Sequence, residues 1–175
     1  KTSSAQTNAT PAPPPPSPTS SSGKPNDAII RTKAQGRFLT AAEVARQIEE
    51  ITFQARGRSF RFRNDLFRDK SGITSLRDSA GAFWGLAIGD INMDGSDDAA
   101  ILLRTDRSGG AAYWDLAYLP NRDGRLFNVQ TVALPGDQGY REAVIEGSTV
   151  LLVPAIDGPS VHLGYSGGEL SIVGR

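Results

Sequence analysis

Residues 90–103 read Asp-Ile-Asn-Met-Asp-Gly-Ser-Asp-Asp-Ala-Ala-Ile-Leu-Leu. The first nine residues carry four carboxylates, one amide and one glycine, whereas the residues after Asp98 are apolar. A second apolar run, Ala-Phe-Trp-Gly-Leu-Ala-Ile at 82–88, lies just before this polar segment. Short apolar runs on both sides of a glycine-containing polar segment are typical of two buried strands joined by a tight loop. We therefore predict a strand–loop–strand unit with its loop at 90–98.

The loop has oxygen ligands at the spacing of a calcium-binding loop. Calcium takes about 6–8 oxygen ligands from carboxylates, amides, carbonyls and water. The predicted ligands stand at loop positions 1, 3, 5, 7 and 9, the one at position 7 through its backbone carbonyl: Asp90, Asn92, Asp94, Ser96 and Asp98. Gly95 at position 6 permits a sharp reversal of the backbone. The sequence thus predicts Ca²⁺ as the cofactor.

Alternatives to a calcium site remain open at this point. Position 12 is Ile101, so the bidentate glutamate of an EF-hand is missing and Asp98 must complete the coordination. Without a cation, the segment would be a turn held by Asx hydrogen bonds. Its carboxylates would then repel one another, because no Lys or Arg lies within the loop. Magnesium is disfavoured since it requires octahedral geometry with several waters. Asp97, Ile91 and Met93 fall between ligand positions, and we expect their side chains to point away from the ion.

The second half of the chain reads as short strands separated by turn residues. Glycine, asparagine and aspartate punctuate it at short intervals, which favours hairpins. The predicted strands span about 82–89, 98–104, 111–119, 126–134, 140–146, 148–154, 160–165 and 169–173. Short connections between sequential strands indicate antiparallel pairing.

A helix and a basic strand are predicted before this series. Thr40 and Glu43 have capping-box spacing, which predicts a helix over about 40–53. Its apolar face consists of Val44, Ile48 and Ile51. At 56–64, phenylalanines alternate with arginines, which indicates a half-buried strand with a solvated or acid-paired basic face; polyanion binding is the alternative. The fold class is therefore α+β, mainly β, with antiparallel sheets of short strands and one N-terminal helix.

Residues 1–28 have the composition of a tether. They contain seven of the eleven prolines, many Ser and Thr, and no aromatic residue. Such a segment cannot bury enough apolar surface to offset its ordering entropy. We predict a disordered tether at 1–28 and a single β-rich domain at 29–175; a docking site for a proline-recognising partner is the alternative for the tether. The chain starts at Lys1, and we expect a leader or tag to have been removed.

Composition narrows the possible functions. Lys and Arg number 19, as do Asp and Glu, so no global field favours nucleic acid. The chain has no cysteine, which excludes disulfides, thiolate metal sites and thiol catalysis. No apolar run approaches the roughly 20 residues that span a bilayer, so membrane attachment is expected only through the N-terminal tether. The partner is predicted to be an unidentified envelope component or protein.

The loop sequence Asp-x-Asn-x-Asp-Gly-x-x-Asp at 90–98 resembles the strand–loop–strand calcium loops of FG-GAP-type repeats. From about Phe60 to Pro154 the chain also resembles a type of bacterial exported protein, often a lipoprotein. In those proteins a similar loop precedes an aromatic-rich hairpin, here Ala-Tyr-Trp-Asp-Leu-Ala-Tyr-Leu-Pro-Asn at 112–121. The resemblance implies an extracytoplasmic location (periplasm, outer envelope or secreted) and a β-rich domain, but no particular activity.

Two classes of function follow from these observations. The first is a non-enzymatic, calcium-binding extracytoplasmic domain with a binding or structural role. The alternative is a hydrolase acting on envelope polysaccharide through a pair of carboxylates. The sole histidine, His162, alternates with apolar residues on a predicted strand, and we expect no catalytic role for it. The acids without an assigned role are Asp115, Glu142, Glu146 and Asp157.

Overall fold

The computed structural model describes residues 38–136 and 138–174. The tether predicted at 1–28 lies outside the described residues. Within them the chain forms one helix and fourteen strands, and every strand pair is antiparallel. The predicted fold class, α+β and mainly β with a single early helix, is confirmed.

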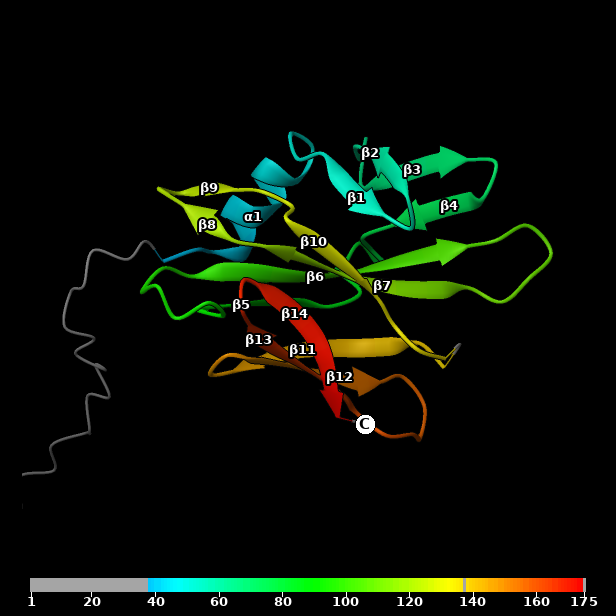
Figure 1. Cartoon of the computed structure of the whole chain (residues 1–175). Coiled ribbons are helices and arrows are strands. Elements are labelled where there is room, and N and C mark those ends of the chain that lie inside the picture. The colour runs from blue at the N-terminus through cyan, green and yellow to red at the C-terminus, as the bar shows by residue number, and fades with distance from the viewer. Residues whose placement is uncertain (1–37, 137, 175) are drawn as a thin grey trace, which may run out of the picture. The chain divides into compact units, whose positions relative to one another are not determined.

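The strands form two larger sheets and two small hairpins (Figure 1). The central sheet has the order β10-β7-β6-β4-β3, with β5 also paired to β6. Its strands are β3 (Leu66–Asp69), β4 (Gly72–Ser75), β5 (Leu86–Gly89), β6 (Asp98–Asp106), β7 (Tyr113–Leu119) and β10 (Gln130–Ala133). The second sheet runs β11 (Tyr140–Glu146), β12 (Thr149–Pro154), β13 (Val161–Ser166) and β14 (Glu169–Gly174). The hairpins are β1 (Phe53–Ala55) with β2 (Arg58–Phe60), and β8 (Asn121–Arg122) with β9 (Arg125–Leu126).

Strand β6 is the centre of the structure. On one side it pairs with β7 over seven consecutive residues, from Ala99 opposite Leu119 to Thr105 opposite Tyr113. On its other side two short strands follow each other, β5 along the first half and β4 along the second. Every side chain from Asp98 to Leu103 is buried. The apolar run that the sequence shows at 99–103 is therefore a strand covered on both faces.

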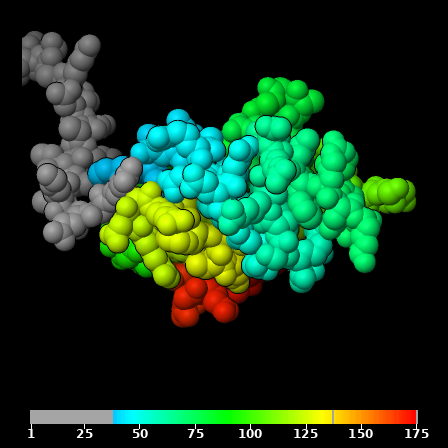
Figure 2. All heavy atoms as spheres, turned by 90° about the horizontal axis from the view of Figure 1, so that it is seen from above, coloured from blue at the N-terminus to red at the C-terminus, as the bar shows by residue number. Residues whose placement is uncertain are grey.

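Successive residues of β6 belong to different cores because side chains alternate across a strand. Ala99, Ile101 and Leu103 pack with the helix α1 (Ala41–Ile48) and the β1–β2 hairpin. Ala100 and Leu102 pack with the second sheet. Figure 1 shows the resulting three layers, with α1 and β1–β2 on one face of the central sheet and β11–β14 on the other. Figure 2 looks onto the first layer, where residues of β8–β10 lie beside α1.

The helix is shorter than predicted. It begins after Thr40, whose hydroxyl accepts a hydrogen bond from the Glu43 N–H while the Glu43 carboxylate accepts one from the Thr40 N–H. This confirms the capping box. The helix ends at Ile48 and not at residue 53, because β1 starts at Phe53 and its pairing with β2 requires extended backbone. No helix within the described residues is long and apolar enough to cross a membrane.

The predicted strand at 56–64 is wrong in its bounds. Arg56 and Gly57 both have positive φ, 50° and 73°, and form the two-residue turn between β1 and β2. Two successive positive φ angles are the signature of a type I′ hairpin turn. The alternation beyond the turn is correct, since Phe60 and Phe62 are buried whereas the arginine between them is exposed. The hairpin of β3 and β4 had no counterpart among the predicted strands.

The three-layer arrangement predicts that two adjacent leucines are equally sensitive to truncation. Leu102 and Leu103 are both fully buried, but in different cores. We expect Leu102→Ala and Leu103→Ala each to lower the free energy of unfolding by about 2–5 kcal/mol, measured by urea denaturation. If only one face of the sheet were covered, one of the two substitutions would be nearly neutral.

Candidate metal-binding loop

The predicted calcium loop connects β5 to β6. Gly89 and Asp98 are the last paired residues of the two strands, so residues 90–97 form the closed loop between them. Asp90 stands at its start and accepts hydrogen bonds from two amides across the loop. Its Oδ1 accepts from the Asp94 N–H at 3.0 Å and its Oδ2 from the Gly95 N–H at 2.9 Å. Gly95 has a φ of 91°, which is the reversal that the sequence predicted for it.

Asn92 and Asp94 continue this pattern of side chains turned onto the loop's own backbone. The Asn92 Oδ1 accepts from the Asp94 N–H at 2.9 Å, and its Nδ2 donates to the Asp94 Oδ2 at 2.9 Å. The Asp94 Oδ1 in turn accepts from the Ser96 N–H at 2.8 Å. The side-chain oxygens at positions 1, 3 and 5 therefore share partners in a single network.

The two apolar residues of the loop lie apart from this network. Ile91 is fully buried and belongs to the core shared with the second sheet. Met93 is 73% exposed and has a φ of 61°, which is uncommon for a residue with a side chain. Ile91 thus attaches the loop to the core, whereas Met93 lies at its exposed tip.

Asp98 connects the loop to two other parts of the structure, β7 and the start of β8. Its Oδ1 accepts a hydrogen bond from the Asn121 N–H at the start of β8, at 3.0 Å. Its Oδ2 accepts from the Tyr118 hydroxyl on β7 at 3.0 Å and from the Asn92 N–H at 3.3 Å. The carboxylate is fully buried. We call these three contacts the Asp98 clasp. The sequence pattern indicates Asp98 only as a metal ligand and gives no indication of Tyr118 or Asn121.

Burial dominates the electrostatics of the clasp. It raises the pKa of Asp98, because removing a carboxylate from water disfavours its charged form. The hydrogen bonds from Asn121, Tyr118 and Asn92 oppose this shift, and the charge of Asp94 adds to it. Burial also raises the pKa of Tyr118, and the neighbouring Asp98 raises it further. Tyr118 is thus a hydroxyl donor to Asp98 throughout the ordinary pH range.

Asp97 occupies a different environment from the other loop acids. Its Oδ2 accepts a hydrogen bond from the Leu39 N–H, just before α1, at 3.2 Å. Asp97 therefore joins the loop to the segment that leads into the helix. Among the described residues, no hydrogen bond joins Asp97 to another side chain of the loop.

The donor set matches the chemistry of a hard cation. A carboxylate offers about four lone-pair sites, so the oxygens of Asp90 and Asp94 retain acceptor capacity beside their backbone hydrogen bonds. In Asp98 only Oδ1 has such capacity, since two donors already occupy Oδ2. Among residues 38–136 and 138–174, no three Asp, Glu or His side chains lie close enough together to hold a metal ion. Coordination would thus combine Asp90, Asn92 and Asp94 with backbone carbonyls and water.

The other acids and the histidine considered as candidate catalytic residues are distant from the loop in the sequence. Asp115 is buried and forms an ion pair with Arg56 at 2.9 Å. Burial raises the pKa of Asp115, and the Arg56 charge opposes the shift. The remaining three acids and the histidine are at least partly exposed: Glu142, Glu146, Asp157 and His162.

Comparisons of the chain with protein-family models, curated proteins and solved structures found no match.

The clasp predicts that a single hydroxyl is important for stability. Tyr118→Phe leaves the buried Asp98 Oδ2 with one donor fewer, and we expect it to lower the free energy of unfolding by about 1–3 kcal/mol. Tyr165→Phe is the matched control. The Tyr165 ring packs against that of Tyr118 at 5.6 Å, but its hydroxyl has no hydrogen bond among the described residues. Equal melting temperatures for Tyr118→Phe and the control would show that the Tyr118 hydroxyl contributes nothing to stability.

Proposed function

We propose that the chain is a calcium-binding extracytoplasmic domain with a structural or binding role rather than an enzymatic one. The observation that supports this most strongly is the loop between β5 and β6. The side chains at positions 1, 3 and 5 form the Asx hydrogen bonds that a metal-free turn would also have, but the carboxylate oxygens of Asp90 and Asp94 retain acceptor capacity for an ion. The glycine at position 6 has the positive φ that the sequence predicts. The resemblance of the loop to FG-GAP-type loops points in the same direction.

Asp90, Asn92 and Asp94 would hold the ion, with the backbone carbonyl of Ser96. Asp98 remains a proposed ligand through Oδ1, in addition to its part in the clasp. The ion would supply positive charge to the three proposed ligand carboxylates among the four in the loop, which has no Lys or Arg. Its effect would be to stabilise the connection between the two strands that carry the central sheet.

The composition of the chain supports the proposed location. A Pro-, Ser- and Thr-rich segment at 1–28 precedes the domain, as expected of a domain held away from an attachment point. Extracellular calcium modules commonly bind with a Kd of about 10⁻⁴–10⁻³ M, so such a loop would be filled outside the cytoplasm. The proposed partner is an envelope component or protein.

Calcium should stabilise the fold because an ion that binds only the native state adds RT ln(1 + [L]/Kd). With the Kd range above, about 2 mM calcium adds roughly 0.7–1.8 kcal/mol. That corresponds to a rise in Tm of roughly 2–7 °C, measured by thermal melting in calcium and in chelator. Magnesium at the same concentration should do much less. Superimposable melting curves in calcium and chelator would refute the proposal.

Substitutions should separate ligands from their neighbours. We expect Asp90→Asn and Asp94→Asn to reduce the calcium-induced rise in Tm strongly, because each removes a charge from the proposed coordination shell. Asp97→Asn is the matched control, since its side chain binds Leu39 and retains an acceptor oxygen for that contact. Asp98→Ala should lower Tm in chelator as well, because it also removes the clasp. Equal loss of the calcium response from Asp90→Asn and Asp97→Asn would show that the ligand set is wrong.

A further inference from the structure

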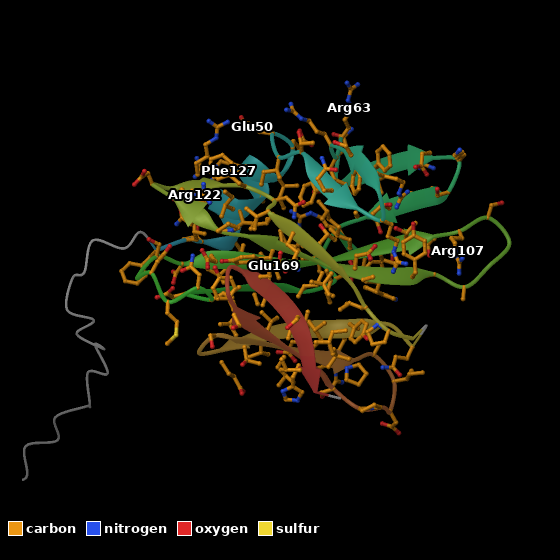
Figure 3. The ribbon with its side chains drawn as sticks, viewed as in Figure 1. Glu50, Arg63, Arg107, Arg122, Phe127 and Glu169 are labelled. Atoms are coloured by element: carbon orange, nitrogen blue, oxygen red, sulfur yellow. The ribbon has the colours of Figure 1, made fainter. Side chains whose placement is uncertain are left out.

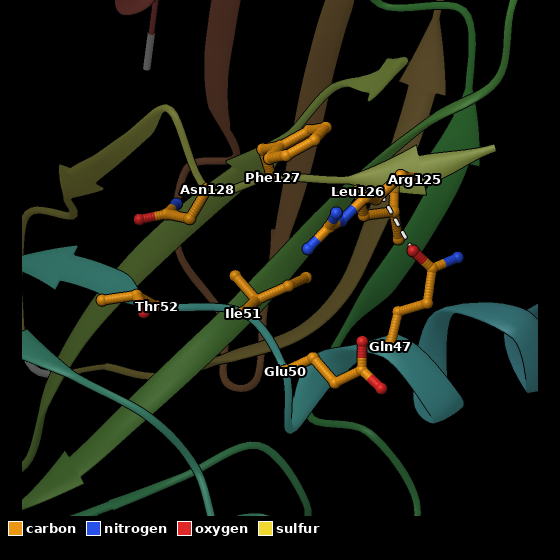
Figure 4. Close-up of a pocket in the computed structure, with 8 residues that line it drawn as sticks. All are labelled: Gln47, Glu50, Ile51, Thr52, Arg125, Leu126, Phe127 and Asn128. Carbon is orange, nitrogen blue, oxygen red and sulfur yellow. Dashed lines mark hydrogen bonds between the residues drawn. The ribbon is translucent and has the colours of Figure 1, made fainter. Parts of the chain in front are cut away.

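A small cavity lies between the end of α1 and the segment that connects β9 to β10. Its volume is about 220 Å³. One wall consists of Glu50, Ile51 and Thr52, which follow the helix, and the other of residues 125–128. Figure 4 shows the guanidinium of Arg125 reaching over the cavity, with the Phe127 ring and Ile51 on either side of it. Glu50 and Phe127 lie in the same layer, whereas Arg107 lies at the far end of the molecule (Figure 3).

The walls of the cavity are held by side-chain amides that are already committed. The Gln47 Nε2 donates to the Gly124 carbonyl at 3.2 Å, and its Oε1 accepts from the Leu126 N–H at 2.9 Å. The Asn128 Oδ1 accepts from the Gln54 N–H at 2.8 Å, which ties the second wall to β1. The side-chain amides of Gln47 and Asn128 thus hold the backbone around the cavity. Because these amides are occupied, the polar groups that can bind a ligand are those at the mouth of the cavity.

The groups at the mouth are one acid, one base and one aromatic ring. Glu50 and Arg125 are exposed and have no ion pair among the described residues. The Arg125 guanidinium lies 5.4 Å from the centre of the Phe127 ring, and that residue is 38% exposed. The opposite charges cancel, so the lining selects neither anions nor cations. It offers a strong acceptor and a strong donor beside an apolar surface.

We propose that this cavity binds one ring of a neutral carbohydrate. Sugar hydroxyls both donate and accept, which suits Glu50 and Arg125, and the C–H face of a pyranose ring suits the exposed part of the Phe127 ring. The volume lies below the roughly 300–1,000 Å³ of drug-sized sites, which limits the ligand to about a single ring. A small amino-acid zwitterion fits less well, because it could pair with both charges but has no ring face to cover Phe127. The inference goes beyond the proposed function and does not depend on the calcium loop.

The test is a titration of the full chain, followed by ¹H–¹⁵N correlation spectra. The probes are D-glucose, D-galactose and N-acetylglucosamine at millimolar concentrations, with L-alanine as the zwitterionic comparison. We expect at least one sugar to cause saturable shifts of the amides at 50–52 and 125–128. Repeating the titration with a disaccharide of the same sugar distinguishes a free sugar from a residue of a glycan chain, which would bind more tightly.

Two variants and a control connect binding to the mouth of the cavity. Phe127→Ala should weaken sugar binding by about tenfold, because it removes the apolar surface under the ring. Glu50→Gln should weaken binding several-fold without loss of folding, since the residue is exposed. Val129→Ala is the control, because Val129 is 48% exposed and lies two residues away but does not line the cavity. The proposal is overturned if no sugar shifts these amides, if only L-alanine does, or if Phe127→Ala binds as tightly as the unmodified chain.

Discussion

The burial of strand β6 on both faces is the constraint on which the rest of the structure depends. A strand with no solvent-facing side needs an apolar layer above it and another below it. The chain supplies one layer from the residues before β6, namely α1 and the β1–β2 hairpin, and the other from the residues after it, β11–β14. The eight-residue helix contributes Val44 and Ile48 to a core that also contains Phe53 of β1 and Phe60 of β2.

Polar side chains take the place of backbone partners where the sheets end. The side chain of Gln130 on β10 donates to the Leu170 carbonyl at 2.9 Å and accepts from the Leu170 N–H at 2.7 Å, which joins the central sheet to β14. The side chain of Gln47 on α1 likewise donates to the Gly124 carbonyl and accepts from the Leu126 N–H, which joins the helix to the β8–β9 hairpin. Asp98 acts similarly at the start of β6, where it satisfies two backbone N–H groups and one hydroxyl. Buried donors without such partners would each cost about 1–3 kcal/mol, so these few residues determine how the layers are joined.

Much of the fold could be predicted because the relevant signals are local. The capping box at Thr40 and the alternation of Phe60 and Phe62 depend only on nearby residues, and both appear in the structure. Most strands from Leu86 onward were predicted within a few residues, because turn residues separate them. The β8–β9 hairpin was missed, since the single strand predicted at 126–134 covers only the end of β9 together with β10. The antiparallel pairing of β5 with β6 follows from the predicted strand–loop–strand unit. The pairing of β4 with β6 could not be predicted, since it joins segments distant in the chain. The hairpin turn at Arg56 was missed because its first residue is an arginine rather than the usual Asn, Asp or Gly.

The candidate site shows the same division between local and distant contacts. The hydrogen bonds among Asp90, Asn92, Asp94 and the backbone of the loop join residues two to five positions apart, within the segment that the sequence predicts as a loop. The contacts of Asp98 with Tyr118 and Asn121 join residues 20 or more positions apart, and no spacing rule indicates them. The same holds for the cavity beside α1, whose two walls come from residues 50–52 and 125–128.

The central functional claim is that the loop at 90–98 binds calcium at a single site attached to the core by Asp98. The most direct measurement is a calcium titration of the chelator-treated chain, followed residue by residue in ¹H–¹⁵N correlation spectra. The account predicts saturable shifts that are largest for the amides of Asn92, Asp94, Gly95 and Ser96, with smaller shifts at Asn121 through the clasp. Magnesium should not reproduce them. Spectra unchanged by millimolar calcium, or shifts centred elsewhere in the chain, would contradict the account.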